Sequence, residues 1–293
     1  MNRPKQQLIA WFVPIVSLLL LTGGIAKSGQ LKSHFTPTSK QATKQTAANL
    51  PAQTLPVPGW LGFTTVATQS KPRFPWSPSH PNGQIVIFSE DWANVKPGTP
   101  LVAVAPGFKQ EVNFLRSSQE GYGCDSIPTA MASFSSQTRS PEGPVWILPP
   151  TAATNATAIP LTAPSLDSIP TNLLPANQRN KAKAWKAGPA TILLQKQGKY
   201  KAKLTVAMNN RAIYTQQVEK YDFGNPDLLE PVNFSQVEPG IPQPMGAFQL
   251  KAGQPPIIVL WRPGYEGNSF DLLVPEGNTA KRVEVGGMYF CGY

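Results

Sequence analysis

The sequence predicts an all-β protein with two small antiparallel β-domains behind an export segment and a disordered tether. Three observations support this. Only 14% of the 293 residues are charged, while 32 are proline and 23 are glycine, which favours strands joined by turns over helical bundles. Short apolar runs recur between Pro, Gly and Asn turn signals. One stretch, residues 191–221, alternates so regularly that the rest of the chain can be arranged around it.

This stretch contains the clearest strand in the sequence. Tyr200, Leu204 and Val206 fall on one face, and Lys201 and Lys203 fall on the other, which is the period-two pattern of a half-buried strand. The turn residues KQGK precede it and NN follows it, because Gly and Asn tolerate positive φ. The stretch therefore predicts a three-stranded antiparallel meander.

The N-terminus has the layout of an export segment. Arg3 and Lys5 precede the uncharged residues 8–26, and Gly24 and Ala26 are small residues suited to a cleavage site. The same 19 uncharged residues are long enough to remain as an uncleaved membrane anchor. We expect residues 1–26 to be a signal peptide or a membrane anchor, and the protein to be exported to the cell envelope, the periplasm or the exterior.

Residues 27–82 are rich in Thr, Ser, Gln, Ala, Lys and Pro and show little apolar periodicity. A segment of this composition buries too little apolar surface to offset the entropy lost on ordering, so we expect a disordered, Pro-rich tether. The aromatic residues near its end offer an alternative, an irregular arm that packs against the first domain. They are Trp60, Phe63, Phe74 and Trp76.

A first β-domain is expected at residues 83–165. The predicted strands are 84–88, 101–105, 111–116, 145–148 and 158–161, separated by turn signals. Their spacing is typical of a small sandwich or barrel. Residues 125–137 fit either a short helix or a further strand.

Residues 166–190 are expected to form a basic connector, and residues 191–293 a second β-domain. Beyond the meander, the predicted strands are 232–234, 247–250, 257–261, 269–274 and 282–290. Seven or eight short strands in about 100 residues suggest an immunoglobulin-like sandwich, although a barrel would produce much the same pattern.

Cys124 and Cys291 are the only cysteines, and a pair in an exported protein is expected to form a disulfide. The alternatives are that both cysteines are free structural thiols, or that Cys124 is a nucleophile, which requires a base. The only histidines, His34 and His80, lie in the tether and on no predicted element, so we favour the disulfide.

No metal site and no cofactor are predicted. Two histidines outside the predicted elements argue against His-ligated metals and Ser-His-Asp catalysis. Oxygen ligands for calcium are present in YDFGNPD, but Asx residues beside Gly and Pro are more often turn formers. The residues concerned are Asp222, Asn225 and Asp227.

Basic residues are concentrated before and within the meander. The chain has a net charge of +10, and residues 177–220 carry ten basic residues and one acidic residue. Such a surface suits an anionic polymer, a lipid surface or an acidic protein; nucleic acid is not expected outside the cell. The alternative is that the lysines only keep an exposed strand soluble. The candidate binding residues are Lys181, Lys183, Lys186, Lys199, Lys201 and Lys203.

Two classes of function follow. The first is an exported, non-catalytic envelope protein that binds or scaffolds an anionic partner, and we favour it because no catalytic set is visible. The second is an envelope carbohydrate-active hydrolase with paired carboxylates on a β-scaffold. The carboxylates considered are Glu90, Asp91, Glu266 and Asp271.

Overall fold

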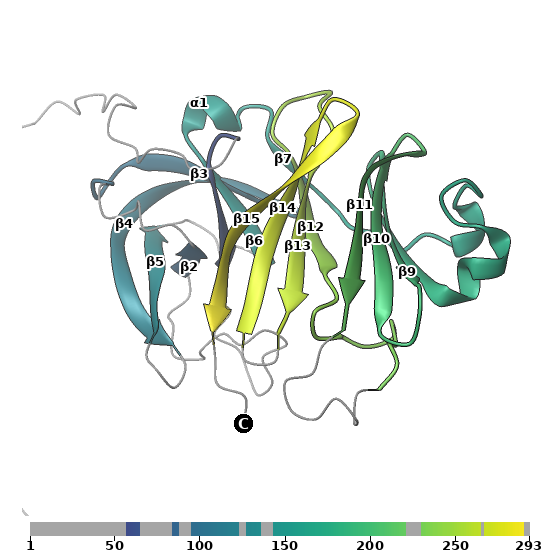
Figure 1. Ribbon diagram of the computed structural model, residues 1–293. Helices are drawn as coiled ribbons and strands as arrows, with labels where there is room; N and C mark the ends of the chain where they lie inside the picture. The colour runs from purple at the N-terminus through teal and green to yellow at the C-terminus, as the bar shows by residue number, and fades with distance from the viewer. Residues whose placement is uncertain are drawn as a thin grey trace, which may run out of the picture. The chain divides into compact units, whose positions relative to one another are not determined.

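The computed structural model describes residues 57–64, 84–87, 95–122, 127–135, 143–220, 230–264 and 267–289 (Figure 1). Contacts along the chain separate residues 1–44 from residues 45–293, and all described residues belong to the second unit. Several predictions lie outside the described residues: the export segment, most of the tether, both cysteines, the candidate calcium ligands and three of the four candidate catalytic carboxylates. The all-β class is confirmed, because the elements are strands apart from α1 and two short 3₁₀ helices.

Six strands close into a barrel in the order β1-β2-β5-β4-β3-β6, with β6 paired to β1. They are β1 (Trp60–Thr64), β2 (Gln84–Ile87), β3 (Pro100–Ala105), β4 (Phe108–Tyr122), β5 (Ile127–Ser135) and β6 (Gly143–Leu148). Alternate residues of β3 and β6 point into the barrel, as Leu101 and Ile147 do, or out of it, as Val102 and Leu148 do. Both sets are buried, which explains the continuous apolar runs of these two strands.

Strand β1 corrects the prediction that all of residues 27–82 are disordered. It pairs with β2 on one side and β6 on the other, and Trp60 and Phe63 are buried. Gly59 allows the chain to enter the barrel: its φ is +90°, and a Cβ there would lie 2.4 Å from the carbonyl oxygen of Ile147. Packing of Trp60 and Phe63 is therefore found, but within a regular strand; Phe74 and Trp76 lie outside the described residues.

The nine remaining strands form two sheets. They are β7 (Thr157–Ile159), β8 (Ala182–Ala187), β9 (Ala190–Lys196), β10 (Lys201–Met208), β11 (Arg211–Glu219), β12 (Gln243–Gln249), β13 (Ile257–Pro263), β14 (Gly267–Glu276) and β15 (Thr279–Tyr289). The first sheet has the order β11-β10-β9-β8 and the second the order β15-β14-β13-β12-β7. The predicted meander of residues 191–221 is confirmed as β9–β11.

The two sheets face each other across an apolar core, so they form a sandwich. This core contains Leu194, Leu204 and Val206 from the first sheet and Leu260 and Leu273 from the second. The strand order differs from that of an immunoglobulin domain, in which Greek-key connections carry the chain between the sheets. Here β8–β11 and β12–β15 are each an uninterrupted meander.

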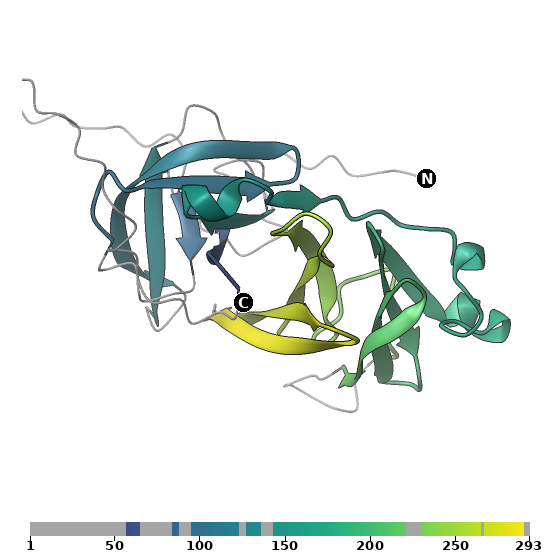
Figure 2. The same ribbon diagram turned by 90° about the horizontal axis from the view of Figure 1, so that it is seen from above.

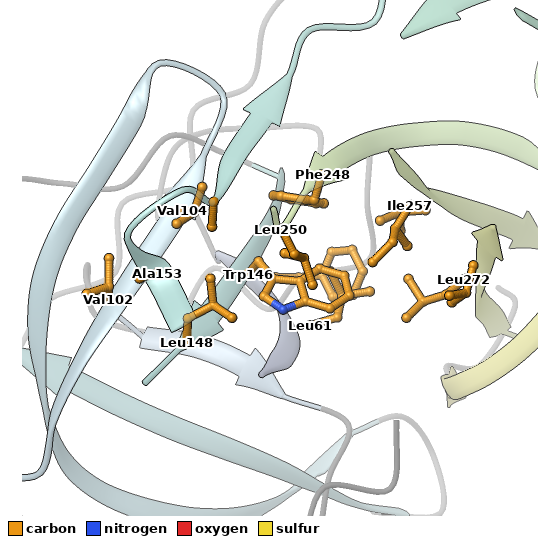
Figure 3. Close-up of a cluster of buried hydrophobic side chains, with 14 of the residues drawn as sticks. Leu61, Val102, Val104, Trp146, Leu148, Ala153, Phe248, Leu250, Ile257 and Leu272 are labelled. Atoms are coloured by element: carbon orange, nitrogen blue, oxygen red, sulfur yellow. The ribbon is translucent and has the colours of Figure 1, made fainter. Parts of the chain in front are cut away.

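The barrel and the sandwich share a second core, which Figure 3 shows. Barrel residues Leu61 and Trp146 pack against Phe248 and Leu272 of the second sheet, and the rings of Trp146 and Phe248 are 5.4 Å apart. The predicted boundaries are corrected at one further point. Residues 158–161 were expected in the first domain, but β7 pairs with β12 of the sandwich.

The segment predicted as a connector, residues 166–190, also carries structure. It contains η3 (Leu166–Ser168), η4 (Ala176–Lys181) and strand β8, while α1 (Pro150–Ala153) lies further upstream. The backbone of this segment runs beside the first sheet (Figure 2). Its apolar residues cover the outer face of that sheet, where Ile169 and Leu174 pack on Leu193. A connector was predicted here because basic residues stand between the apolar ones in the sequence.

Candidate functional site

The six candidate lysines are distributed over both faces of the first sheet. Lys201 and Lys203 lie on the outer face of β10, because Ala202 and Leu204 between and beside them point into the core. Lys199 was expected on the same strand, but it lies in the turn that precedes β10. All three are at the end of the sheet where β9 passes into β10.

Lys183 lies at the same end of the sheet but on its inner face. Its neighbour Ala184 packs with Ile169 and Leu174 on the outer face, and successive residues of a strand point to opposite faces. Lys181 is the last residue of η4, directly before β8. Lys186 is separated from the others, because it pairs with Thr191 near the opposite end of the sheet.

Lys196 was not among the candidates, yet it lies at this same end. It follows Ile192 and Leu194 on the inner face of β9, where the apolar core stops. We use the term basic end for the group of lysines at this end of the sheet: Lys181, Lys183, Lys196, Lys199, Lys201 and Lys203.

A cleft of about 590 Å³ opens at the basic end, between η4 and the chain that follows Val232. Its volume is within the range of small-molecule sites. Its lining combines ammonium groups, neutral amides and one aromatic ring. We call it the basic cleft, and its principal side chains are Asn180, Lys181, Lys196, Gln197, Asn233 and Phe234.

The η4 wall of the cleft is fixed by polar contacts on its own side. Arg179 forms an ion pair with Asp167, with Nη1 3.0 Å from Oδ1, and its Nη2 donates to the carbonyl oxygen of Ile169 at 3.3 Å. The side chains of Gln178 and Gln195 are hydrogen-bonded to each other. These contacts hold the wall to the sheet and to η3.

The opposite wall is held by a buried ion pair. Glu238 is 1% exposed, and its Oε2 lies 2.5 Å from Nζ of Lys220, which is 9% exposed. The other carboxylate oxygen, Oε1, accepts a hydrogen bond of 2.6 Å from the backbone N–H of Asn233. Val232 forms two hydrogen bonds with the end of the sheet. Its N–H donates to the backbone carbonyl oxygen of Lys199 at 2.8 Å, and its own carbonyl oxygen accepts from Nζ of Lys196 at 3.0 Å.

The lysines of the basic end are little neutralised. Between described residues they form one ion pair, Lys201 with Glu219, whose charged atoms are 3.8 Å apart and exposed. An exposed pair of this kind contributes about 0–1 kcal/mol. Lys183 and Lys199 each lie over a neighbouring aromatic ring, about 5 Å from its centre. The basic end therefore presents a concentrated positive charge.

Asp271, the described member of the four candidate catalytic carboxylates, is engaged in ion pairs. It is fully buried inside the sandwich, with Oδ1 3.0 Å from Arg282 Nε and Oδ2 3.6 Å from Arg262 Nη2. Tyr214 packs nearby on β11, and burial raises the pKa of its phenol above 10. A carboxylate held between two arginines is poorly placed to act as a nucleophile or a base, so Asp271 gives the hydrolase alternative no support.

Within the described ranges, no group of three or more His, Cys, Asp or Glu is arranged to hold a metal ion. None of the helices in this part of the chain has the length and apolar character to cross a membrane. Comparison with known proteins finds no match: no family model, no curated protein and no solved structure matches this chain.

Sequence reasoning missed one lysine and one complete wall of the cleft. Lys196 follows Ile192 and Leu194 at the two-residue spacing of a strand, so the sequence alone was enough to place it on the apolar face of β9. Asn233 and Phe234 were placed on a predicted strand, residues 232–234, but these residues form a turn. The ion pair between Lys220 and Glu238 has no local sequence signal, because its partners come from different elements of the fold.

Proposed function

We propose that this is an exported, non-catalytic protein of the cell envelope that binds an anionic polymer or surface through its basic end. The observation that carries the proposal is the gathering of six lysines from η4, three strands of the first sheet and a turn. Among the residues that the structure describes, one of them forms an ion pair, Lys201 with Glu219, and this pair is exposed. Such a concentration of one sign of charge attracts anionic partners over distances up to the Debye length, about 8 Å at physiological ionic strength.

Export follows from the N-terminal pattern of basic head, uncharged middle and small residues. The full chain with a C-terminal tag is expected in the envelope or the exterior after fractionation. A tagged protein found wholly in the cytosol would contradict this part of the proposal.

The proposed location also predicts a disulfide between Cys124 and Cys291. In a loop of this length a disulfide contributes on the order of 5 kcal/mol, less any strain. Mass spectrometry of peptides digested without reduction is expected to show the two cysteine peptides joined. Two free thiols in the exported protein would exclude the bond.

Binding is tested with vesicles that contain anionic lipid and with acidic polysaccharide. In the variant Lys199→Gln/Lys201→Gln/Lys203→Gln, three surface lysines are lost at about 1 kcal/mol each, so retention is expected to fall about 100-fold at low salt. The control carries the same charge change at exposed lysines elsewhere. It is Lys96→Gln/Lys251→Gln/Lys281→Gln.

The fold is expected to survive both changes, because the lysines of the outer face contribute nothing to the apolar core. The parent should lose affinity as salt is raised, since exposed charges are screened. Equal retention of the two triple variants and the parent, with matched stability, would leave only a role of these lysines in solubility.

A further inference from the structure

The groups in the basic cleft are more varied than a purely electrostatic contact requires. A lipid surface or polyphosphate chain is attracted by ammonium groups alone, wherever they lie. The cleft adds the amides of Asn180, Gln197 and Asn233 and the ring of Phe234. On these grounds we propose that the cleft binds an acidic sugar unit, a uronate, within an anionic polysaccharide. This inference rests on the proposed function and names its ligand class.

The amides favour a ligand with hydroxyl groups. A side-chain amide offers two N–H donors and one carbonyl acceptor, and a sugar hydroxyl both donates and accepts. A fully ionised phosphate or carboxylate chain has no donors, so it could pair only with the N–H groups of the exposed side chains Asn180 and Gln197, and their amide oxygens would stay with water. Hydroxyls beside the anionic group can use both the donors and the acceptors of these amides, so the lining favours a ligand that carries them.

The amide of Asn233 has a defined orientation. Its Oδ1 accepts hydrogen bonds from the N–H of Ser235 at 3.1 Å and from the Ser235 hydroxyl at 2.8 Å. No hydrogen bond joins Nδ2 to any residue in the described ranges, so both of its N–H groups are available to a ligand. The exposed side chain thus presents donors at the rim of the cleft.

The cations are positioned for a carboxylate. Lys196 is half-buried, and its ammonium group is held by the 3.0 Å hydrogen bond to Val232, which leaves further N–H groups for a ligand. Lys181 is exposed on the η4 wall. A carboxylate that enters the cleft therefore meets two ammonium groups that come from different elements.

Phe234 supplies an apolar surface beside these polar groups. Its half-buried ring packs against the sandwich core and also lines the cleft. The C–H face of a sugar ring suits such a surface, whereas a phosphate chain has no apolar face. A peptide bound in extended form takes main-chain hydrogen bonds from a sheet edge, but the polar groups identified here are side-chain amides and ammonium groups.

The cleft is formed before any ligand binds. Polar contacts hold both walls: on one side Arg179 donates to the carbonyl oxygen of Ile169 and Gln178 is hydrogen-bonded to Gln195, and on the other side Lys220 forms a buried ion pair with Glu238. A site whose walls are already ordered loses less conformational entropy on binding, and its spacing selects between ligands.

The test is calorimetric titration of the full mature protein with a galacturonate hexamer. The controls are its neutral methyl ester, a polyphosphate of equal charge and a glutamate hexamer. We expect the galacturonate hexamer to bind at least tenfold more tightly than each of the three. If all anions bind equally and the ester does not, the cleft is not a sugar site, although the proposed function survives. If no anion binds, both proposals fail.

Variants locate the binding. Asn233→Asp keeps the acceptor for Ser235 but replaces the two free donors with a negative charge, so galacturonate affinity is expected to fall at least tenfold. Asn210→Asp makes the same change in the turn between β10 and β11, at the far end of the sheet, where Asp tolerates the positive φ of 64°. It is expected to change affinity less than twofold, and equal effects of the two variants would refute the cleft as the site.

Phe234→Leu distinguishes recognition of the sugar ring from electrostatic attraction of any anion to the lysines. We expect it to weaken galacturonate binding at least fivefold and to leave retention on anionic vesicles unchanged. An equal loss on both, or no loss on either, would overturn the assignment. Thermal unfolding of each variant is measured beside the parent, and Phe234→Tyr, which keeps the ring, is expected to restore galacturonate binding.

Discussion

Glu238→Ala tests whether a buried ion pair holds the wall of the basic cleft. The substitution leaves the ammonium group of Lys220 in a site where it is 9% exposed, and it leaves the N–H of Asn233 without its acceptor. Removing one partner of a buried pair costs about 3–5 kcal/mol. In a domain of this size, about 1 kcal/mol lowers Tm by about 2–4 °C, so we expect Tm to fall by about 6–20 °C.

Chemical denaturation and thermal unfolding measure this effect, and a double variant controls for burial. In Lys220→Met/Glu238→Leu no charge is buried, so most of the lost stability should return, because apolar residues often replace a buried pair at no cost. A free energy of unfolding for Glu238→Ala within about 1 kcal/mol of the parent's would show that the pair contributes no more than a solvated surface pair and does not hold the wall. A double variant as unstable as Glu238→Ala would likewise contradict this role of the pair.

Three further predictions concern the fold. Phe63→Ala removes a fully buried ring 4.4 Å from that of Phe270 and should cost about 3–5 kcal/mol by denaturation, whereas a residue in a disordered tether would cost nothing. Gly59→Ala forces a Cβ against the β6 backbone at φ +90° and should cost about 1–3 kcal/mol; Gly277→Ala, at φ +61° in open space, should cost less, and the reverse order would contradict the packing. Burial raises the pKa of Tyr214, so the protonated phenol contributes to the free energy of unfolding below pH about 10, and this contribution is lost as pH rises through the pKa of the folded state. The free energy of unfolding of the parent should therefore fall with pH in this range, and Tyr214→Phe should lack that part of the fall. An identical pH profile for the variant and the parent would contradict this prediction.

Strands with one clear signal were predicted from the sequence. In β10 the alternation of lysines with Leu204 and Val206 identifies both the strand and its buried face. In β3 and β6 the apolar runs between turn residues give the strands within one or two residues. These signals are local, and the structure confirms them because tertiary packing follows the same pattern.

Strand β1 could not be predicted in this way. It has five residues, one of them Gly62, and both of its faces are buried, so it has no alternation to detect. Strand β8 was also missing from the prediction, for a different reason. Its lysines gave residues 182–187 the composition of a solvated connector, although Ala184 and Ala187 are buried.

The candidate site was only partly predictable because its walls meet through long-range contacts. The sequence placed the candidate lysines around the start of the meander, but it predicted neither the end of the sheet at which five of them lie nor the separation of Lys186 from the others. The approach of Asn233 and Phe234 to Lys196 depends on how the chain returns after β11, and on the pairing of Lys220 with Glu238. Neither has a periodic signal, so only the folded structure reveals the cleft.

Lysine footprinting with an amine-reactive reagent, with and without a galacturonate polymer, tests the central claim most directly. Lysines of the basic end, Lys181, Lys196 and Lys199 foremost, are expected to be protected when the polymer is bound. Lys186 lies on the same strand as Lys183 but near the other end of the sheet, and it should react at an unchanged rate. Protection of Lys186 equal to that of Lys181 and Lys196, or protection of none of them, would contradict the account.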